Sequence, residues 1–390
     1  MTSKLSIPGC ALALALCACA SSSPEVRGSS GDSPGPGAEP RGFTVDPKWP
    51  KQLPNNWILG QVSGIAVDAD DHVWLLQRPA SLTEDEKGAA LNPPHSKCCV
   101  PAPPVLELDG DGKLLRAWGG AGAGYDWPGN EHGIHVDAKG FVWVSGNGDN
   151  DGQILRFTRD GKFVSQIGKP GPQTNSADTT RLGKPAGMEL DPQTNEVFVA
   201  DGYQNHRIIV FDADTGAYKR HWGAYGKPPI DEGKVTLRRD QPPPDPPPQQ
   251  FGNPVHCVRL AKDGLVYVCD RLNDRVQVFK RDGSFVKEFV IEPRTAANGS
   301  VWDLALSRDP EQRFLYLADG RNNQLLTLAR NTGAVVATTG YPGRSAGAFH
   351  WVHDIAIDSQ GNLYAGEVDT GKRAQRFTPA AKPAAISRKP

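Results

Sequence analysis

Short runs of alternating apolar and polar residues fill the chain from about residue 43 to residue 377, and their arrangement repeats six times. Each repeat starts with an alternating run, passes through a turn that usually holds Gly, and continues with an aromatic-rich run such as VWLL, VWVS, VFVA, VYVC, LYLA or LYAG. Further apolar runs complete the repeat. Period-two alternation between turn residues is typical of β-strands joined in hairpins. Four antiparallel strands per repeat, at about 45 residues or more, predict an all-β fold, a six-bladed β-propeller.

The sixth repeat is one strand short, because it ends at Arg376-Phe377 after three apolar runs. A fourth run is available at the other end of the domain, in Phe43-Thr-Val-Asp. Pairing between these ends would remove an open sheet edge that otherwise favours aggregation. We therefore predict a propeller over residues 43–377 whose N-terminal strand closes the last blade, and a loose tail over 378–390.

One position near the start of each repeat is histidine in every second copy. In chain order it is occupied by Ser63, His132, Ala186, His256, Trp302 and His353. If six blades close into a ring, alternate blades lie about 120° apart at the same height. The three imidazoles are therefore expected to converge on the central axis.

A single histidine at such a position would be read as a hydrogen-bonded core residue. Three in the same register of alternate blades favour a metal site. Catalytic zinc typically takes three protein ligands and keeps a fourth position open for water or substrate. We predict that His132, His256 and His353 bind zinc.

Composition narrows the possible partners. The formal net charge is −1, so the chain lacks the excess of basic residues that is typical of nucleic-acid-binding proteins. No apolar run beyond the leader is long enough to span a bilayer.

The N-terminal segment has the features of an export signal. Lys4 precedes a short apolar stretch, Ile7–Ala18, which ends in Leu-Cys-Ala-Cys. This end resembles the lipobox of bacterial lipoproteins and makes Cys19 the predicted lipidated residue. Cys17 is a second candidate, preceded by a large leucine, and a plain secretory signal cut near Ala20 is the alternative.

These features predict a signal peptide over residues 1–19 and a flexible Ser-, Gly- and Pro-rich tether over 20–42. The expected location is the bacterial cell envelope, as an outer-membrane lipoprotein that faces the periplasm and is held to the membrane by its lipid.

Export places the remaining cysteines in an oxidising compartment. Cys257 and Cys269 lie symmetrically about the turn at residues 262–264, so they can form a disulfide across a hairpin if the strand register holds. Cys98 and Cys99 are adjacent, and the sequence leaves open a vicinal disulfide, two bridges elsewhere or free thiols.

Two insertions interrupt the repeats. Residues 79–104 separate the second and third strands of the first blade, and residues 224–252, which are rich in proline, separate the third and fourth blades. The first insertion starts directly after Arg78, so we expect it to shape the mouth of the channel.

The stretches ADGYQNHRIIVF (200–211) and CDRLNDRVQVF (269–279) resemble NHL repeats. Together with HGIHVDAKGFVWV and VHDIAIDSQGNLYAGE, they are similar to the catalytic domain of peptidyl-α-hydroxyglycine α-amidating lyase. That resemblance implies a six-bladed propeller that cleaves a C-terminal α-hydroxyglycine into a peptide amide and glyoxylate. The implied substrate is a peptide or small molecule.

The resemblance also assigns roles to residues. It places catalytic zinc on the three histidines, the catalytic tyrosine at Tyr203, and the active-site arginine at Arg78. Tyr203 would act as a general base, and Arg78 would bind a carboxylate or stabilise developing negative charge.

A structural calcium ion is implied as well. Its ligands would be the Asp354 side chain and the backbone carbonyls of Ile65 and Ile134. Calcium prefers oxygen ligands, whereas zinc accepts imidazoles, so the two sites would not compete.

Two other functions fit the same pattern. The chain could be a non-enzymatic binding module that presents the propeller rim to a protein partner, because a fold does not determine a function. It could also be a lactonase-type hydrolase with a cation in the channel, although such sites are usually rich in carboxylates.

Overall fold

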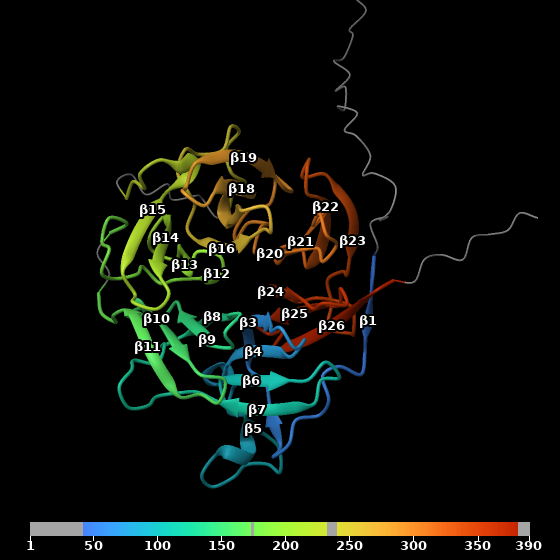
Figure 1. The fold of residues 1–390 in the computed structure, drawn as a ribbon. Coiled ribbons are helices and arrows are strands. Elements are labelled where there is room, and N and C mark those ends of the chain that lie inside the picture. The colour runs from blue at the N-terminus through green and yellow to red at the C-terminus, as the bar shows by residue number, and fades with distance from the viewer. Residues whose placement is uncertain (1–41, 173–174, 232–239, 381–390) are drawn as a thin grey trace, which may run out of the picture. The chain divides into compact units, whose positions relative to one another are not determined.

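The structure, a computed structural model, describes residues 42–172, 175–231 and 240–380. All of them belong to one compact unit, Pro34–Pro390, of the two into which the chain divides. The predicted fold class is confirmed. The described residues form six four-stranded antiparallel sheets. Figure 1 shows the sheets arranged as a ring around a central axis.

The first three blades follow one another along the chain. Blade one consists of β3 (Gln61–Val67), β4 (Val73–Arg78), β6 (Val105–Leu108) and β7 (Leu114–Trp118). Blade two consists of β8 (Glu131–Val136), β9 (Val142–Gly146), β10 (Gln153–Phe157) and β11 (Phe163–Gly168). Blade three consists of β12 (Gly187–Asp191), β13 (Glu196–Asp201), β14 (Arg207–Asp212) and β15 (Tyr218–Trp222).

The remaining blades complete the ring. Blade four consists of β16 (Val255–Leu260), β17 (Leu265–Asp270), β18 (Arg275–Lys280) and β19 (Phe285–Val290). Blade five consists of β20 (Asp303–Leu306), β21 (Phe314–Asp319), β22 (Gln324–Ala329) and β23 (Val335–Thr339). Blade six consists of β24 (Val352–Ile357), β25 (Leu363–Glu367), β26 (Arg373–Pro379) and β1 (Phe43–Asp46).

The N-terminal strand closes the last blade, as predicted. β1 pairs antiparallel with β26 over its whole length, from Phe43 opposite Pro379 to Asp46 opposite Arg376. The last pair also forms an ion pair between its side chains. The closing strand thus joins the two ends of the domain, and β26 continues to Pro379, just past the predicted boundary at residue 377.

Buried apolar side chains fill the space between the blades. The described part of the chain contains six hydrophobic clusters, and each combines residues of two neighbouring blades. For example, Trp143 of blade two packs in one cluster with Met188 and Val197 of blade three. Because alternate residues of each strand face the neighbouring sheets, the period-two pattern seen in the sequence builds these interfaces.

The first insertion forms a small lobe beside blade one. It contains the single-turn helices η1 (Pro79–Ser81) and η2 (Gly88–Ala90) and the strand β5 (Val100–Pro101). β5 pairs in parallel with β2 (Trp57–Ile58), and Figure 1 shows this lobe projecting beyond the ring. Cys98 and Cys99 are joined as a vicinal disulfide within it.

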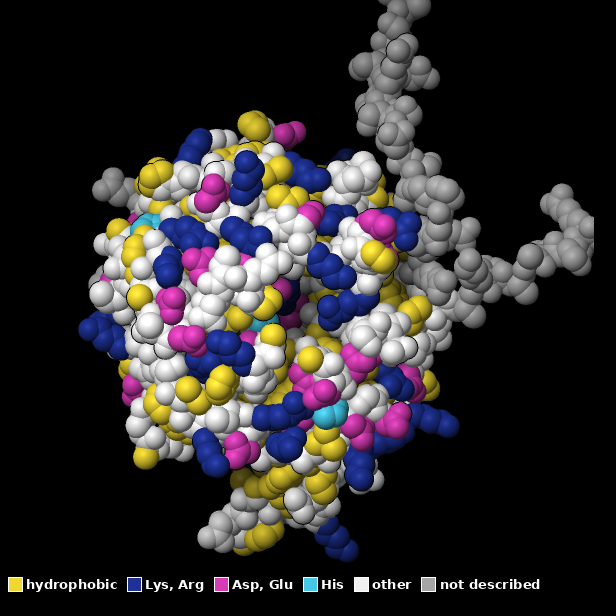
Figure 2. All heavy atoms as spheres, in the orientation of Figure 1, with side chains coloured by type: hydrophobic (Ala, Val, Ile, Leu, Met, Phe, Trp, Pro, Cys, Tyr) yellow, Lys and Arg dark blue, Asp and Glu magenta, His cyan; other side chains and the backbone are white. Residues whose placement is uncertain are grey.

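The second insertion begins with η3 (Ala224–Gly226) and includes residues 232–239, which lie outside the described residues. In blade four, Cys257 stands directly opposite Cys269 in the strand register, and their sulfur atoms are bonded. Figure 2 shows one face of the ring hollowed at its centre, with charged side chains around the hollow.

The predicted signal peptide, Cys19, Cys17 and the tether up to residue 41 lie outside the described residues, as does the tail from residue 381. Among the described residues, no helix is long and apolar enough to cross a membrane.

Candidate metal centre

The three predicted histidines meet in the channel. His132 lies on β8, His256 on β16 and His353 on β24, the first strands of blades two, four and six. Their ring centroids form a nearly equilateral triangle with sides of 5.0, 4.8 and 4.8 Å. Their exposed fractions are only 2, 4 and 3%, so the cluster is enclosed by protein.

A local irregularity in each strand turns these side chains inward. The pairing register shifts at Glu131/Ile134, at Val255/Cys257 and at Val352/Asp354, so each histidine lies within a β-bulge. β-Bulges commonly redirect a side chain next to a functional site. The same shift occurs at Val62/Gly64 around Ser63 in blade one, so the bulge does not require a histidine.

Each histidine bonds to the equivalent position of the next blade. The Nδ1 of His132 is 3.0 Å from the carbonyl oxygen of Ala186, and the Nδ1 of His353 is 2.8 Å from that of Ser63. His256 makes the same contact with the carbonyl of Trp302. A carbonyl only accepts, so each Nδ1 carries the proton and each Nε2 presents its lone pair to the channel.

Burial lowers the pKa of all three imidazoles well below the ordinary histidine value. For His132 and His256 the charge of His353 is the next cause, and for His353 it is the charge of Arg78. The rings are therefore neutral at physiological pH, which is the form that binds a metal ion.

Tyr203 lies directly at this centre. Its hydroxyl oxygen is 2.9 Å from Nε2 of His132 and 3.1 Å from Nε2 of His256. The structure thus brings the tyrosine expected from the resemblance together with the histidine cluster.

A buried motif holds the loop that carries Tyr203. At the end of β13, Asp201 accepts hydrogen bonds from Asn205 Nδ2 at 2.8 Å and from Arg207 Nε at 2.9 Å. Between the carboxylate and the tyrosine, Gly202 packs so closely against the start of β16 that a Cβ atom would collide with its backbone. The Asp, Asn and Arg of the repeat motif therefore fix the loop, and Gly202 lets it approach blade four.

Blade four repeats the motif and positions a residue that the sequence reasoning missed. Asp270 accepts hydrogen bonds from Asn273 Nδ2 at 2.9 Å and from Arg275 Nε at 2.6 Å. The short helix η4 (Arg271–Asn273) starts directly after this aspartate.

Arg271 reaches the centre from that loop. Its Nη1 is 3.2 Å from the Tyr203 hydroxyl, and its guanidinium lies 4.5 Å from the ring centre of Trp302. Its exposed fraction is 8%. The sequence does contain a signal for Arg271. It follows the end of the second strand of blade four, and Arg78 ends the second strand of blade one.

Arg78 also lies beside the centre. Its Nε donates to the carbonyl of Glu131, the residue before His132, at 2.6 Å, and its Nη1 donates to Gln61 Oε1 at 2.8 Å. Its positive charge contributes to the lowered pKa of His132 and His353. The two arginines make this end of the channel electropositive.

The donor set fits zinc. Three neutral imidazoles, one from each alternate blade, place their ligand nitrogens within 4.8 Å of one another. Each ring is oriented by a backbone carbonyl on its other nitrogen, as is usual for metal-binding histidines. Which metal binds stays a prediction.

The residues expected to hold calcium lie near one another, but a guanidinium already contacts the carboxylate. Asp354 Oδ1 is 3.3 Å from Nη2 of Arg259, and its Oδ2 accepts from the Ile65 amide at 3.4 Å. The same Nη2 is 2.6 Å from Asp303 Oδ1. A fixed positive charge therefore stands where the ion is expected; Ile134 lines the small adjacent cavity. Calcium stays a prediction from the resemblance.

Fold and site together define a six-bladed β-propeller whose channel holds three buried histidines beside a tyrosine and two arginines. No protein-family model matches the chain. The chain is 27% identical to rat peptidylglycine alpha-amidating monooxygenase over 381 residues, which covers 89% of the chain but only 34% of that protein. The chain thus spans about a third of the length of that relative.

Two further relatives are of different kinds. The probable peptidyl-alpha-hydroxyglycine alpha-amidating lyase of Caenorhabditis elegans is 27% identical and covers 57% of this chain and 56% of its own length. Mouse NHL repeat-containing protein 3 is 24% identical over 86% of this chain and 84% of its own length. The chain is therefore similar both to amidating enzymes and to NHL repeat proteins.

Solved structures agree on the fold. A streptogramin B lyase superposes with a TM-score of 0.50 at 14% identity and covers 87% of this chain and 98% of its own. At such low identity the likeness concerns the fold alone.

Proposed function

We propose that this chain is a zinc-dependent lyase that cleaves the C–N bond of an α-hydroxyglycine-type substrate and releases an amide and glyoxylate. The observation that carries the proposal is the contact of the Tyr203 hydroxyl with two inward-facing histidine nitrogens and with Arg271. Similarity to amidating enzymes supports the same chemistry. Bound zinc would polarise a substrate oxygen and acidify the substrate hydroxyl.

Tyr203 is the proposed general base. Its phenolate oxygen would take the proton of the substrate hydroxyl, and Arg271 would stabilise the negative charge of that phenolate. The hydroxyl oxygen then forms a carbonyl with its carbon, and the C–N bond breaks. The electron pair of that bond goes to the amide nitrogen, which takes a proton from the tyrosine. Atoms and charge balance without any oxidant.

Arg78 is the proposed anchor for the substrate. Its Nε and Nη1 are held by Glu131 and Gln61, so the guanidinium has a fixed orientation beside the histidines. A fixed guanidinium suits the carboxylate of a terminal hydroxyglycine, because the fork of N–H groups matches the two carboxylate oxygens.

The test is turnover of an α-hydroxyglycine peptide, with glyoxylate release as the readout. Tyr203→Phe should retain bound zinc but lose about 10²–10⁴-fold in kcat, the usual range for a general base. Tyr218→Phe is the matched control, because Tyr218 is exposed on β15, where its hydroxyl contacts only His221 among the described bonds. No turnover by the parent protein with zinc bound would refute the lyase proposal.

A non-enzymatic binding module is the second candidate. Its support is the similarity to mouse NHL repeat-containing protein 3, which extends over most of both chains. A protein partner would then bind at the propeller rim. Tight partner binding that is insensitive to a zinc chelator, in a protein without turnover, would favour this function.

We also propose that the chain is an exported envelope lipoprotein anchored through Cys19. The support is the leader sequence. Metabolic labelling with a palmitate analogue should mark the parent and not Cys19→Ala. Label that persists in Cys19→Ala but disappears in Cys17→Ala would move the anchor to Cys17.

A further inference from the structure

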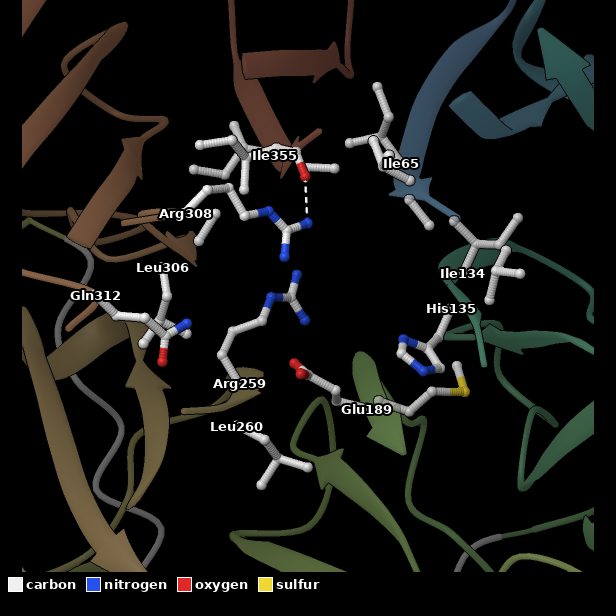
Figure 3. A pocket seen from close by; sticks show the side chains of 17 residues that line it. Ile65, Ile134, His135, Glu189, Arg259, Leu260, Leu306, Arg308, Gln312 and Ile355 are labelled. Carbon is white, nitrogen blue, oxygen red and sulfur yellow. Dashed lines mark hydrogen bonds between the residues drawn. The ribbon is translucent and has the colours of Figure 1, made fainter. Parts of the chain in front are cut away.

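The channel contains a second cavity that the proposed lyase site does not use. Its volume is about 250 Å³, and its lining is drawn in Figure 3. A cavity of about 150 Å³ is enough for a benzene molecule, so this one has room for a small organic compound.

The lining comes from a second repeat position. The residues three places after the histidine position of each blade all line the cavity; they are Ala66, His135, Glu189, Arg259, Ala305 and Ala356. Three residues of a strand span about 10 Å, so this ring lies about 10 Å further along the channel than the histidines. Blades two, three and four contribute polar side chains, whereas blades five, six and one contribute alanines, whose small size leaves space.

A second arginine points into this space. Arg308 follows β20, and its Nη2 donates to the carbonyl of Ile357, as Figure 3 shows. In the three described stretches of the chain, no carboxylate forms an ion pair with Arg308. A guanidinium has five N–H donors, so one bond to a carbonyl leaves most of its hydrogen-bonding capacity for a ligand.

Two neutral side chains add donors. The amide of Lys262 donates to Gln312 Oε1 at 2.8 Å, which leaves the Nε2 group of Gln312 on the cavity side, where Figure 3 shows it. The amide of Leu190 lies 3.3 Å from Nε2 of His135, so the proton of this ring is on Nδ1. Burial lowers the pKa of His135 to about 4, and the ring is a neutral donor.

The charges of the cavity favour an anion. Arg259 is already compensated by Asp303 and Asp354. Glu189 is the one carboxylate among the lining residues, and burial raises its pKa to about 7, with the charges of Arg259 and, more weakly, Arg308 acting in the opposite direction. The positive charge of Arg308 is therefore the least compensated charge in the cavity.

We propose that this cavity is a binding site for a small organic acid. The ligand's carboxylate binds Arg308 and the Nε2 group of Gln312, and its apolar part packs against the alanines and against Ile65, Ile134 and Ile355 of the lining. The apolar lining favours an organic acid over inorganic phosphate, because phosphate has no apolar surface to bury. The site is independent of the proposed lyase activity.

Ligand-observed NMR titration of the full chain with propionate tests the proposal. The titration is made with 1,10-phenanthroline present, so that zinc cannot bind the carboxylate. Arg308→Met should weaken propionate binding at least tenfold. Arg321→Met is the matched control, because Arg321 is an exposed arginine of the same blade, and it should leave binding unchanged. Propionamide, the neutral isostere, should not bind.

A second variant guards against misfolding of the first. Gln312→Glu keeps the acceptor for the Lys262 amide but adds negative charge to the cavity, and it should also abolish propionate binding. Unchanged propionate binding in both Arg308→Met and Gln312→Glu would overturn the proposal. Equal binding of propionamide, or Arg308-dependent binding of phosphate without binding of propionate, would overturn it as well.

Discussion

The two ends of the channel are built from the same strands but differ in how the blades contribute their side chains. At the histidine end, alternate blades contribute the same side chain, and the three rings meet with nearly threefold symmetry. At the other end, consecutive blades contribute His135, Glu189 and Arg259, and the opposite blades contribute alanines. A symmetric set of like ligands suits one ion at the axis, whereas a one-sided set suits an asymmetric molecule with a charged and an apolar part.

A short ionic network separates the two ends. Arg259 reaches both Asp303 and Asp354, each of which directly follows a residue of the histidine ring position. A much smaller cavity, about 10 Å³, lies between the histidines and this network. The two sites thus share strands but not a continuous space for a ligand. A substitution at one site is therefore expected to leave the other site intact.

The largest expected effect is on metal binding. His256→Ala should lose essentially all zinc, because two imidazoles remain where three are needed. His135→Ala removes a half-buried histidine from the other end and should retain one zinc per chain. Elemental analysis of the two purified variants measures their zinc content. Zinc retained in His256→Ala would rule out the histidine cluster as the ligand set.

Arg271→Met is expected to have the next largest effect. The loss of a donor at 3.2 Å from the Tyr203 hydroxyl should lower kcat about 10²–10³-fold, the range seen when one charge-stabilising donor is removed. Steady-state kinetics of glyoxylate release, with zinc content measured in parallel, checks it. The exposed Arg294 on the chain segment before blade five supplies the control Arg294→Met. A variant that kept full activity would exclude Arg271 from the reaction.

Residues that occupy a repeat position could be predicted, because register in the sequence becomes position in the ring. That reasoning placed His132, His256 and His353 together and paired Phe43 with the last blade. It applies equally to the cavity residues, since Glu189 and Arg259 stand three places after that position. The residue type at this position differs from blade to blade, so no recurring residue revealed it. A histidine that recurs in alternate blades is easier to recognise.

Residues in the loops were harder to predict, because the sequence does not give the direction in which a loop folds. Arg271 lies in η4 and Arg308 lies on the segment after β20, so the positions of their side chains depend on how these segments fold. The Arg259 contact with Asp354 depends on the packing of two distant strands, β16 and β24, across the channel. For that reason the resemblance implied Asp354 as a calcium ligand without indicating that the Arg259 guanidinium contacts it.

The ionic network predicts a smaller effect on stability. Asp303→Ala removes a buried carboxylate, the closer partner of the half-buried Arg259. It should lower the free energy of unfolding by about 3 kcal/mol, the lower end of the range for a buried pair, because Asp354 remains. Asp263→Ala, which breaks a half-exposed pair with Arg330, should lower it by about 0–1 kcal/mol. Urea denaturation measures both. Equal effects would mean that this network contributes no more to stability than a half-exposed ion pair does.

The smallest expected effect is the pH dependence that Glu189 gives to the free energy of unfolding. Burial raises its pKa from 4.5 to about 7 in the folded chain, so the folded state binds the proton more tightly than the unfolded state does. The stability that this group contributes is present below pH 4.5 and declines as the pH rises through 7. The full change in pKa corresponds to about 3 kcal/mol. Because the Glu189 side chain is only half-buried, solvent reduces the expected change to on the order of 1–2 kcal/mol.

Glu189→Gln should therefore be more stable than the parent at pH 8, and this advantage should fall as the pH is lowered to 5. Urea denaturation at the two pH values measures the difference, and Glu292→Gln, at an exposed position, is the control. A constant difference between Glu189→Gln and the parent would show that the carboxylate is ionised in the cavity, and the charge argument for an anion there would weaken accordingly.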